Sequence, residues 1–242
     1  MIYSSSFFDE IVPESLSSAK VIVPIVVELT HPSSVVDVGC AMGAWLSVFR
    51  EHGIENIIGL DWDYVDRSKL LIPSTRFRTV DLAAPFYLEE RFDLAVSLEV
   101  AEHLPATSAK GFVESLCRVA PVILFSAAVP GQGGTNHVNE QWPEYWRQLF
   151  AKQNFRMFDP FRPLIWHDER IVSHYRQNMF LLVHADLIEA DSKFIKLPEI
   201  LDDNGLMLIS GFILRANVDK GLGAVLRQLP RLFINSVRRR FK

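Results

Sequence analysis

Two stretches of the chain carry residues suited to holding an adenosine-containing ligand. An apolar run at residues 35–38 leads into a turn with Gly39 and Gly43, and a second run, at residues 57–60, ends at Asp61. A glycine turn lets the backbone approach a ligand, and a carboxylate after the next strand can accept both ribose hydroxyls. The two stretches therefore predict an adenosine-cofactor site. Asp61 could instead be a helix cap or a turn residue.

Further acids follow the later apolar runs. Asp81 comes directly after residues 76–80, and Glu99 comes directly after residues 92–98. Open α/β sheets bind ligands at the carboxyl ends of their strands, so both acids are candidates for the same site. Each has a structural alternative, because Asp81 could cap the following segment and Glu99 could be solvated. Trp62 could stack on an adenine ring or simply pack.

Three residues could remove a proton from an acceptor. His137 and Glu140 belong to a polar, glycine-rich loop at residues 126–140, and His103 follows the fourth apolar run. Histidine titrates near neutrality, so His137 is the preferred general base. Glu140 could orient His137 or an acceptor hydroxyl, or help to cap the next helix. His103 could instead pack beneath the helix that begins near Pro105.

A fourth polar group lies between the last two apolar runs. Its nitrogen and oxygen donors could in principle hold a divalent metal, but no spacing among them is diagnostic. The residues are His167, Asp168, Glu169 and His174. We therefore assign no metal and interpret this segment as a solvated lid on the substrate side.

The elements that must position these residues are strands and helices in alternation. Continuous apolar runs predict strands covered on both faces, and i, i+3, i+4 spacing predicts helices. The sequence predicts an α/β fold with a doubly wound, mostly parallel seven-stranded sheet whose last two strands form an antiparallel hairpin. Strands are expected at residues 35–38, 56–60, 76–80, 92–98, 122–125, 155–158 and 179–183. Helices are expected at residues 7–30, after Gly43, at 106–119 and around Trp142–150.

The chain divides into three parts by its pattern. They are an N-terminal helical segment (residues 1–30), a ligand-binding domain (31–185, with an insertion at 159–177) and a C-terminal extension (186–242). In the first part, Pro13 suits the first turn of a helix and Pro24 should kink it. The last part ends in a basic amphipathic helix at residues 217–241.

Charge separates the end of the chain from the rest. Seven basic residues and no acid lie between Lys220 and Lys242, which leaves 18 basic and 29 acidic residues before them, a net charge of −11. A body this acidic binds polyanions poorly, so we expect no nucleic-acid partner. The basic helix could contact an anionic membrane surface or a second copy of the chain, or it could be a solvated tail.

The remaining composition is that of a globular chain in a reducing compartment. Cys40 and Cys117 are too few for a disulfide framework or a cysteine-based zinc site. The first residues lack the basic region of a signal peptide, and the apolar runs are too short to cross a bilayer. We expect a cytoplasmic protein, with the C-terminal helix as a peripheral contact at the inner face of the membrane if it is an anchor.

Together these features resemble the class I S-adenosylmethionine-dependent methyltransferases, over residues 30–185. The resemblance rests on DVGCAMG at residues 37–43, on Asp61 and Asp81, and on SLEVAEH at residues 97–103. It implies a seventh strand that is antiparallel and inserted between the fifth and sixth. It also implies S-adenosylmethionine as methyl donor, with S-adenosylhomocysteine as product. The residues implied to hold the donor are Asp37, Gly39, Cys40, Ala41, Gly43, Asp61, Trp62, Asp81, Leu82 and Glu99.

Within that resemblance, individual roles follow the family pattern with one departure. Asp81 and Leu82 resemble the adenine clamp, and Glu99 resembles the residue that lines the methionine end. Ala41 stands where the family has the middle glycine of three. Because alanine tolerates only negative φ comfortably, we expect the turn to keep Ala41 in an ordinary conformation.

The loop and helix start at residues 134–142 are similar to bacterial methyltransferases that modify sugars and surface glycans. Its amide, imidazole and carboxylate side chains bond hydroxyls, and Trp142, Tyr145 or Trp146 could stack on a sugar face, although aromatic residues on one helical face are more often core. The resemblance thus implies methylation of an oxygen, rather than a nitrogen, of a small polar or glycan acceptor, with His137 as base.

Two other functions remain open from the sequence. An NAD-dependent oxidoreductase or epimerase should show a Gly-x-Gly-x-x-Gly turn and a Tyr-x-x-x-Lys pair, and neither is present. A regulatory protein that binds S-adenosylmethionine without catalysis would share the turn and the acids. Binding and turnover experiments separate these alternatives.

Overall fold

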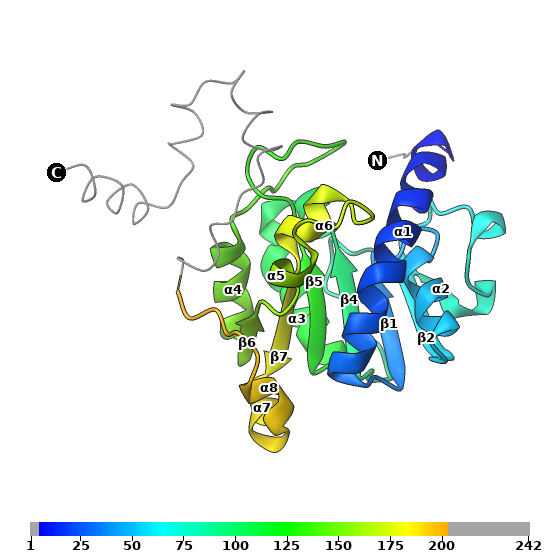
Figure 1. Ribbon diagram of the computed structural model, residues 1–242. Helices are drawn as coiled ribbons and strands as arrows, with labels where there is room; N and C mark the ends of the chain where they lie inside the picture. The colour runs from blue at the N-terminus through cyan, green and yellow to red at the C-terminus, as the bar shows by residue number, and fades with distance from the viewer. Residues whose placement is uncertain (1–4, 203–242) are drawn as a thin grey trace.

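The centre of the molecule is one seven-stranded sheet, seen in the computed structural model, which describes residues 5–202 and the side chains from residue 11 onward (Figure 1). The strands are β1 (Ser34–Val38), β2 (Asn56–Asp61), β3 (Phe77–Thr79), β4 (Leu94–Leu98), β5 (Val122–Ser126), β6 (Phe155–Phe158) and β7 (Phe180–His184). Their order across the sheet is β3-β2-β1-β4-β5-β7-β6. The predicted strands are confirmed with small shifts of their ends.

The predicted antiparallel pair at the end of the chain is confirmed. β1 to β5 pair in parallel, whereas β7 runs antiparallel to both β5 and β6 and lies between them. Strand order also reverses in the middle of the sheet, because β1 pairs with β2 on one side and with β4 on the other. A reversal of this kind leaves a crevice at the carboxyl ends of the strands, where doubly wound sheets bind ligands.

Helices cover both faces of the sheet, which is the doubly wound arrangement that the sequence predicts (Figure 1). One face packs against α1 (Ser5–Thr30), α2 (Ala44–Glu51), α5 (Arg162–Ile165) and α6 (Ser173–Asn178), and the other packs against α3 (Ala109–Val119) and α4 (Pro143–Ala151). Two short helices, α7 (Ala185–Ala190) and α8 (Ser192–Ile195), follow β7. The insertion between β6 and β7 contains α5 and α6.

Alternate residues along the central strands feed opposite cores. In β5, Val122 and Leu124 pack with the α1 and α2 side, whereas Ile123 and Phe125 pack with the α3 and α4 side. All five residues of β5 are buried. A strand buried on both faces has no polar side to present, which is why the sequence shows it as a continuous apolar run.

α1 differs from its prediction in where the prolines fall. The helix begins at Ser5 and runs without interruption to Thr30, so Pro13 lies in its interior rather than in its first turn, and Pro24 is also inside it. Proline removes one backbone hydrogen bond in each case. The loss is tolerated because Ile22, Val23 and other residues of one face are buried against α2 and the sheet, and packing supplies most helix stability in proteins.

The predicted basic helix at residues 217–241, with its membrane or oligomer contact, lies outside the described residues. Among residues that the structure describes, no helix combines the length and the apolar character needed to cross a bilayer.

Candidate active site

A cavity of about 600 Å³ opens at the carboxyl ends of the parallel strands. Its wall combines the turn after β1, the end of β2, the segments after β3 and β4, the loop between β5 and α4, and parts of α1 and α6. The sequence-predicted residues that line it are Asp37, Gly39, Cys40, Ala41, Asp61, Trp62, Asp81, Leu82, Glu99, His103 and His137. Gly43 and Glu140 belong to the same segments but do not line the cavity.

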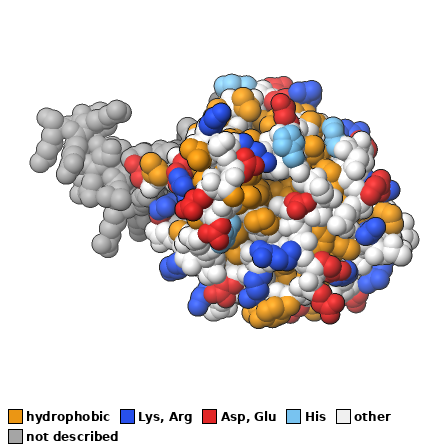
Figure 2. All heavy atoms as spheres, turned by 90° about the horizontal axis from the view of Figure 1, so that it is seen from below, with side chains coloured by type: hydrophobic (Ala, Val, Ile, Leu, Met, Phe, Trp, Pro, Cys, Tyr) orange, Lys and Arg blue, Asp and Glu red, His pale blue; other side chains and the backbone are white. Residues whose placement is uncertain are grey.

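A second depression, of about 530 Å³, lies at the other end of the strands, near the start of β5. Pro121 before β5, Phe155 at the start of β6 and His184 at the end of β7 are part of its wall, and none of the predicted site residues reaches it. Figure 2 shows this side of the molecule, where acidic and basic side chains are interspersed with apolar ones. The candidate site residues therefore gather in the first cavity, at the carboxyl ends of the parallel strands.

Three residues of the turn after β1 have a positive φ, the left-handed backbone conformation that glycine adopts most easily. Gly39 and Gly43 have φ of 88° and 80°, and Ala41 has φ of 47°. The expectation that Ala41 keeps a negative φ is therefore wrong. A hydrogen bond from the Ala41 N–H to Oδ2 of Asp61, at 2.7 Å, holds the residue in the left-handed region. That contact offsets a cost of roughly 1–2 kcal/mol for a residue with a Cβ.

Asp61 ties the turn to the end of β2. Its Oδ2 accepts from Ala41, and its Oδ1 accepts from the Trp62 N–H at 2.7 Å and from the Tyr64 hydroxyl at 2.5 Å. Burial raises the pKa of Asp61, and these three hydrogen bonds oppose the rise. A carboxylate has about four acceptor positions. Asp61 thus has about one position left for a ligand unless the Tyr64 hydroxyl moves away.

Asp37, in β1, is buried with its Oδ2 lacking any hydrogen-bond partner among the described residues. Burial, and then repulsion from Asp61, raises the pKa of Asp37 well above its usual range. The same surroundings raise the pKa of the neighbouring Cys40 thiol, with burial as the main cause. An unpaired buried carboxylate in a cavity wall is costly, and a cationic ligand would relieve that cost.

The residues after β2 and β3 form the more open side of the cavity. Trp62 is 43% exposed, and Leu82 is buried. Oδ1 of Asp81 accepts from the Ala83 N–H at 2.9 Å, which is the turn-forming role that the sequence left open for it. Asp81 also lines the cavity, so it combines a local structural contact with a place on the cavity wall.

Glu99, after β4, is part of an amide network that sequence reasoning missed. Its Oε2 accepts from Nε2 of Gln132 at 2.7 Å, and its Oε1 accepts from Nδ2 of Asn178 at 3.2 Å. Asn178 also donates to Oε1 of Gln132 at 2.8 Å. These contacts join β4, the loop before α4 and α6 at one wall. A buried amide directly before the apolar run of β7 is the signal that could have pointed to Asn178.

His137 and Glu140 form a hydrogen-bonded pair at the cavity rim. Nδ1 of His137 lies 2.9 Å from Oε1 of Glu140, and the side chains are 11% and 20% exposed. Glu140 also accepts from the N–H groups of Gly131 and Gly133, at 2.7 and 2.8 Å. Partial burial alone would raise the pKa of Glu140, but the hydrogen bonds from His137 and the two backbone groups outweigh it and lower the pKa.

The second histidine, His103, lies beside this pair. The His103 and His137 rings are 4.9 Å apart between centroids and nearly perpendicular. Burial, and then the neighbouring His137, lowers the pKa of His103. His103 belongs to the 3₁₀ helix η3 (Ala101–His103) and lines the cavity, so it does more than pack beneath the following helix.

Glu102, next to His103, was not chosen from the sequence, although it belongs to the run that carries the family resemblance. It is fully buried and lines the cavity, and at ordinary hydrogen-bond geometry neither carboxylate oxygen has a partner among the described residues. Burial, and then the nearby Glu99, raises the pKa of Glu102 well above its usual range. The signal available was the acid pair at i and i+3 followed by a histidine.

Two groups that the sequence offered as possible ligand contacts lie mostly outside the cavity. Asp168 pairs with Arg170, at 2.6 Å between Oδ2 and the guanidinium, and of the four polar residues in the insertion only His174 lines the cavity. The three aromatic residues Trp142, Tyr145 and Trp146 do not line it either. Trp146 is buried against Phe125 because α4 turns this face to the sheet, so the core alternative is the one that the structure confirms for Trp146.

The sequence and the fold were compared with known proteins. A family model described as a methyltransferase domain matches residues 16–162. The sugar N-methyltransferase KedS8 from Streptoalloteichus sp ATCC 53650 is similar in structure, with a TM-score of 0.58 at 14% identity, covering 76% of this chain and 96% of that one. No curated protein matches the sequence.

Two further solved structures share the fold. CalS10, an amino pentose methyltransferase from Micromonospora echinaspora, has a TM-score of 0.56 at 14% identity and covers 76% of this chain and 99% of its own. DesVI from Streptomyces venezuelae has a TM-score of 0.54 at 14% identity, with 72% and 93% covered. Because the family match spans more than half of the chain and the sheet has the inserted antiparallel strand, the chain belongs to the methyltransferase domain family and is a class I S-adenosylmethionine-dependent methyltransferase.

Proposed function

We propose that this enzyme transfers the methyl group of S-adenosylmethionine to a hydroxyl oxygen of a small polar or sugar acceptor, with His137 as the general base. The observation that carries the proposal is the His137–Glu140 pair, because it places an imidazole on the wall of the cavity that also contains the predicted donor residues.

The donor fits the cavity by charge. S-adenosylmethionine supplies a methyl group on a positively charged sulfur, and its methionine end carries an ammonium group. Asp37 presents a buried, unpaired carboxylate oxygen, and Glu99 lies across the same cavity. Both acids would attract the cationic end, while Asp61 and Asp81 would face the adenosine. These acidic residues would repel a negatively charged ligand, so an anionic cofactor would bind poorly in this cavity.

The proton has an acceptor in the same wall. With Nδ1 of His137 held by Glu140, the ring's Nε2 is the atom that can accept the hydroxyl proton. Glu140 fixes the ring orientation through its two backbone contacts and stabilises the imidazolium that forms. The hydroxyl oxygen then attacks as its proton leaves, which is the ordinary arrangement of general-base catalysis.

A second candidate function is methylation of an amino group. The structural neighbours KedS8 and CalS10 are described as a sugar N-methyltransferase and an amino pentose methyltransferase. In this chain, the buried carboxylate of Glu102 would suit a cationic amine. An acceptor panel must therefore contain hydroxyl sugars and amino sugars of the same ring size.

The test measures formation of S-adenosylhomocysteine from S-adenosylmethionine with each acceptor, together with calorimetric binding of S-adenosylhomocysteine. His137→Ala should lower turnover by roughly 10²–10⁴-fold and change cofactor affinity less than about threefold, because the ring lies on the acceptor side. His52→Ala is the matched control, since His52 is exposed at the end of α2. Full activity of His137→Ala would refute the base assignment.

The panel also separates the two remaining alternatives. Binding of S-adenosylhomocysteine without turnover on any acceptor would favour a regulatory protein that has lost catalysis. Turnover on amino sugars alone, with no dependence on His137, would favour nitrogen over oxygen as the acceptor atom.

A further inference from the structure

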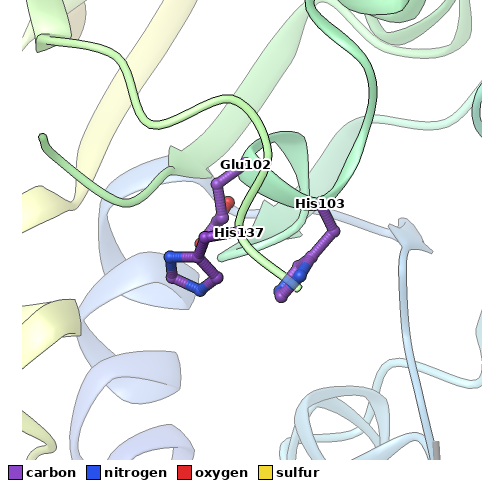
Figure 3. Close-up of side chains that lie close together, drawn as sticks. All are labelled: Glu102, His103 and His137. Atoms are coloured by element: carbon purple, nitrogen blue, oxygen red, sulfur yellow. The ribbon is translucent and has the colours of Figure 1, made fainter. Parts of the chain in front are cut away.

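Three side chains that can bind a metal lie together in the wall of the cavity. Glu102, His103 and His137 each offer one ligand atom, and these atoms all lie within 4.8 Å of one another. Figure 3 shows Glu102 and His103 coming from η3 and His137 from the loop between β5 and α4, with the three side chains close together. This group differs from the histidine and acid residues of the insertion that the sequence suggested.

Glu102 supplies the observation that points to a ligand. Its side chain is completely buried and lines the cavity, and neither carboxylate oxygen makes a hydrogen bond of ordinary geometry within the described part of the chain, although Glu99 and the Ala128 backbone are close enough to shift its pKa. Buried carboxylates are normally paired or coordinate metal ions, because an unpaired one loses its solvation without compensation. Burial and the nearby Glu99 raise the pKa of this carboxyl, so a bound proton is the competing occupant.

His137 is oriented as metal-binding histidines usually are. Its Nδ1 is engaged by Oε1 of Glu140, which leaves Nε2 as the ligand atom. A histidine that donates one ring nitrogen to a carboxylate and binds a metal with the other is the common arrangement around protein metals. Gly134 packs against this side of the ring, and any larger residue there would collide with it, because a Cβ would come within 2.3 Å of Nε2.

Backbone hydrogen bonds hold the two segments in register. The N–H groups of Val138 and Asn139 donate to the carbonyl oxygen of Glu102, at 2.9 and 3.0 Å. The amide of buried Asn139 also donates to the Ala101 carbonyl at 3.5 Å. The loop that carries His137 is thereby fastened to the segment that carries the other two ligands, so the group is assembled before any ion binds.

We propose that Glu102, His103 and His137 bind one divalent cation of the first transition row, such as Mn²⁺, Fe²⁺, Co²⁺ or Zn²⁺. Two imidazoles and one carboxylate suit these ions better than Mg²⁺ or Ca²⁺, which prefer all-oxygen sites. Three protein ligands leave coordination positions that face the cavity, where the oxygen of an acceptor can bind.

The cation site deepens the proposed function and rests on it for its role. A cation beside an acceptor hydroxyl lowers the pKa of that hydroxyl, so the oxygen loses its proton more readily. In the cation-loaded enzyme, Nε2 of His137 would be a ligand, so the hydroxyl proton would pass to solvent water. The role of proton acceptor that we propose for His137 belongs to the cation-free enzyme. Methyl transfer to oxygen is the outcome in both forms.

The experiment measures cation binding by the full chain without donor or acceptor. Protein stripped with a chelator and then freed of it is titrated with Mn²⁺, followed by electron paramagnetic resonance, and with Co²⁺, followed by visible absorption. We expect one ion per chain, and at least a tenfold loss of affinity in Glu102→Gln, a substitution of nearly equal size. Glu114→Gln is the matched control, because Glu114 lies on α3 beside Lys110 and away from the cavity.

Each result decides the question without reference to turnover. Absence of bound Mn²⁺ and Co²⁺ in the wild type overturns the cation site, and so does equal affinity in Glu102→Gln. His137→Ala provides a second variant if Glu102→Gln fails to fold, and it should also lose at least tenfold in affinity. A bound ion in an enzyme that methylates no acceptor would support the site and refute the proposed function, whereas turnover in ion-free protein that binds no ion would do the reverse.

Discussion

Asp37 should lower the stability of the empty folded protein and, in the proposed function, strengthen binding of the cationic donor. Its carboxylate is buried and has an unpaired oxygen, so the ionised form is destabilised in the empty protein. Asp37→Asn removes that charge at nearly constant size. We expect a higher Tm near neutral pH, by roughly 2–4 °C for each kcal/mol regained, and a weaker affinity for S-adenosylhomocysteine.

The pH dependence of that difference has a definite sign. Because burial raises the pKa of Asp37 in the folded protein above its unfolded value, the folded state binds more protons, and stability contributed by this residue falls as pH rises between the two pKa values. Asp37→Asn lacks this loss, so its Tm advantage over the wild type should grow from about pH 4 upward. An advantage that shrinks with rising pH would contradict the account.

Glu140 should matter for turnover more than for stability or cofactor affinity. Glu140→Gln keeps the size of the side chain but removes the charge that holds Nδ1 of His137. We expect turnover to fall roughly 10–100-fold while the affinity for S-adenosylhomocysteine stays the same. Steady-state kinetics and calorimetry check this, with Glu189→Gln, on the exposed side of α7, as the matched control. Unchanged turnover would mean that Glu140 only stabilises its loop.

At the scale of elements, substitutions in the turn after β1 show how much the protein's stability depends on the positive φ values of this turn. A Cβ at Gly39 would lie 2.3 Å from the Val100 side chain at a φ of 88°. Gly39→Ala should therefore destabilise the protein by roughly 2–4 kcal/mol, measured by denaturant unfolding.

Ala41→Gly is the complementary change in the same turn. It relieves an unfavourable φ of 47°, but it also makes the unfolded chain more flexible. The two effects nearly cancel, so stability should change by less than about 1 kcal/mol. A large loss of stability in Ala41→Gly would show that the methyl group of Ala41 contributes packing that the backbone argument leaves out.

The same turn shows how far the sequence predicts this structure. Apolar runs located the strands, most clearly the central ones, because a strand buried on both faces, such as β5, has no polar positions to obscure the pattern. The φ of Ala41 could not be predicted, since it depends on the carboxylate of Asp61 twenty positions away in the chain. Local sequence cannot show a contact that exists only after β2 pairs with β1.

Side-chain networks within the site were equally hidden. His137 and Glu140 are three residues apart, so their pairing was accessible to sequence reasoning. Gln132 and Asn178 meet Glu99 across distances of 33 and 79 residues. For Trp146 the sequence left a sugar contact and core packing both open, because an aromatic face on a helix looks the same whether it meets a ligand or the sheet.

At the scale of the whole molecule, the sheet brings together acids from the ends of β1, β2, β3 and β4 in one cavity, while the loop before α4 adds the imidazole of His137. The residues that we propose for the donor and for the acceptor thus line the same cavity. The central claim is that this cavity binds S-adenosylmethionine.

The most direct test is calorimetry of the wild-type chain with S-adenosylhomocysteine and, in parallel, with NAD. We predict that S-adenosylhomocysteine binds one site per chain and that NAD does not compete. Asp61→Ala should lose most of the affinity, because that carboxylate holds the turn after β1 and is the residue that we propose for the ribose. Binding of NAD alone would contradict the central claim.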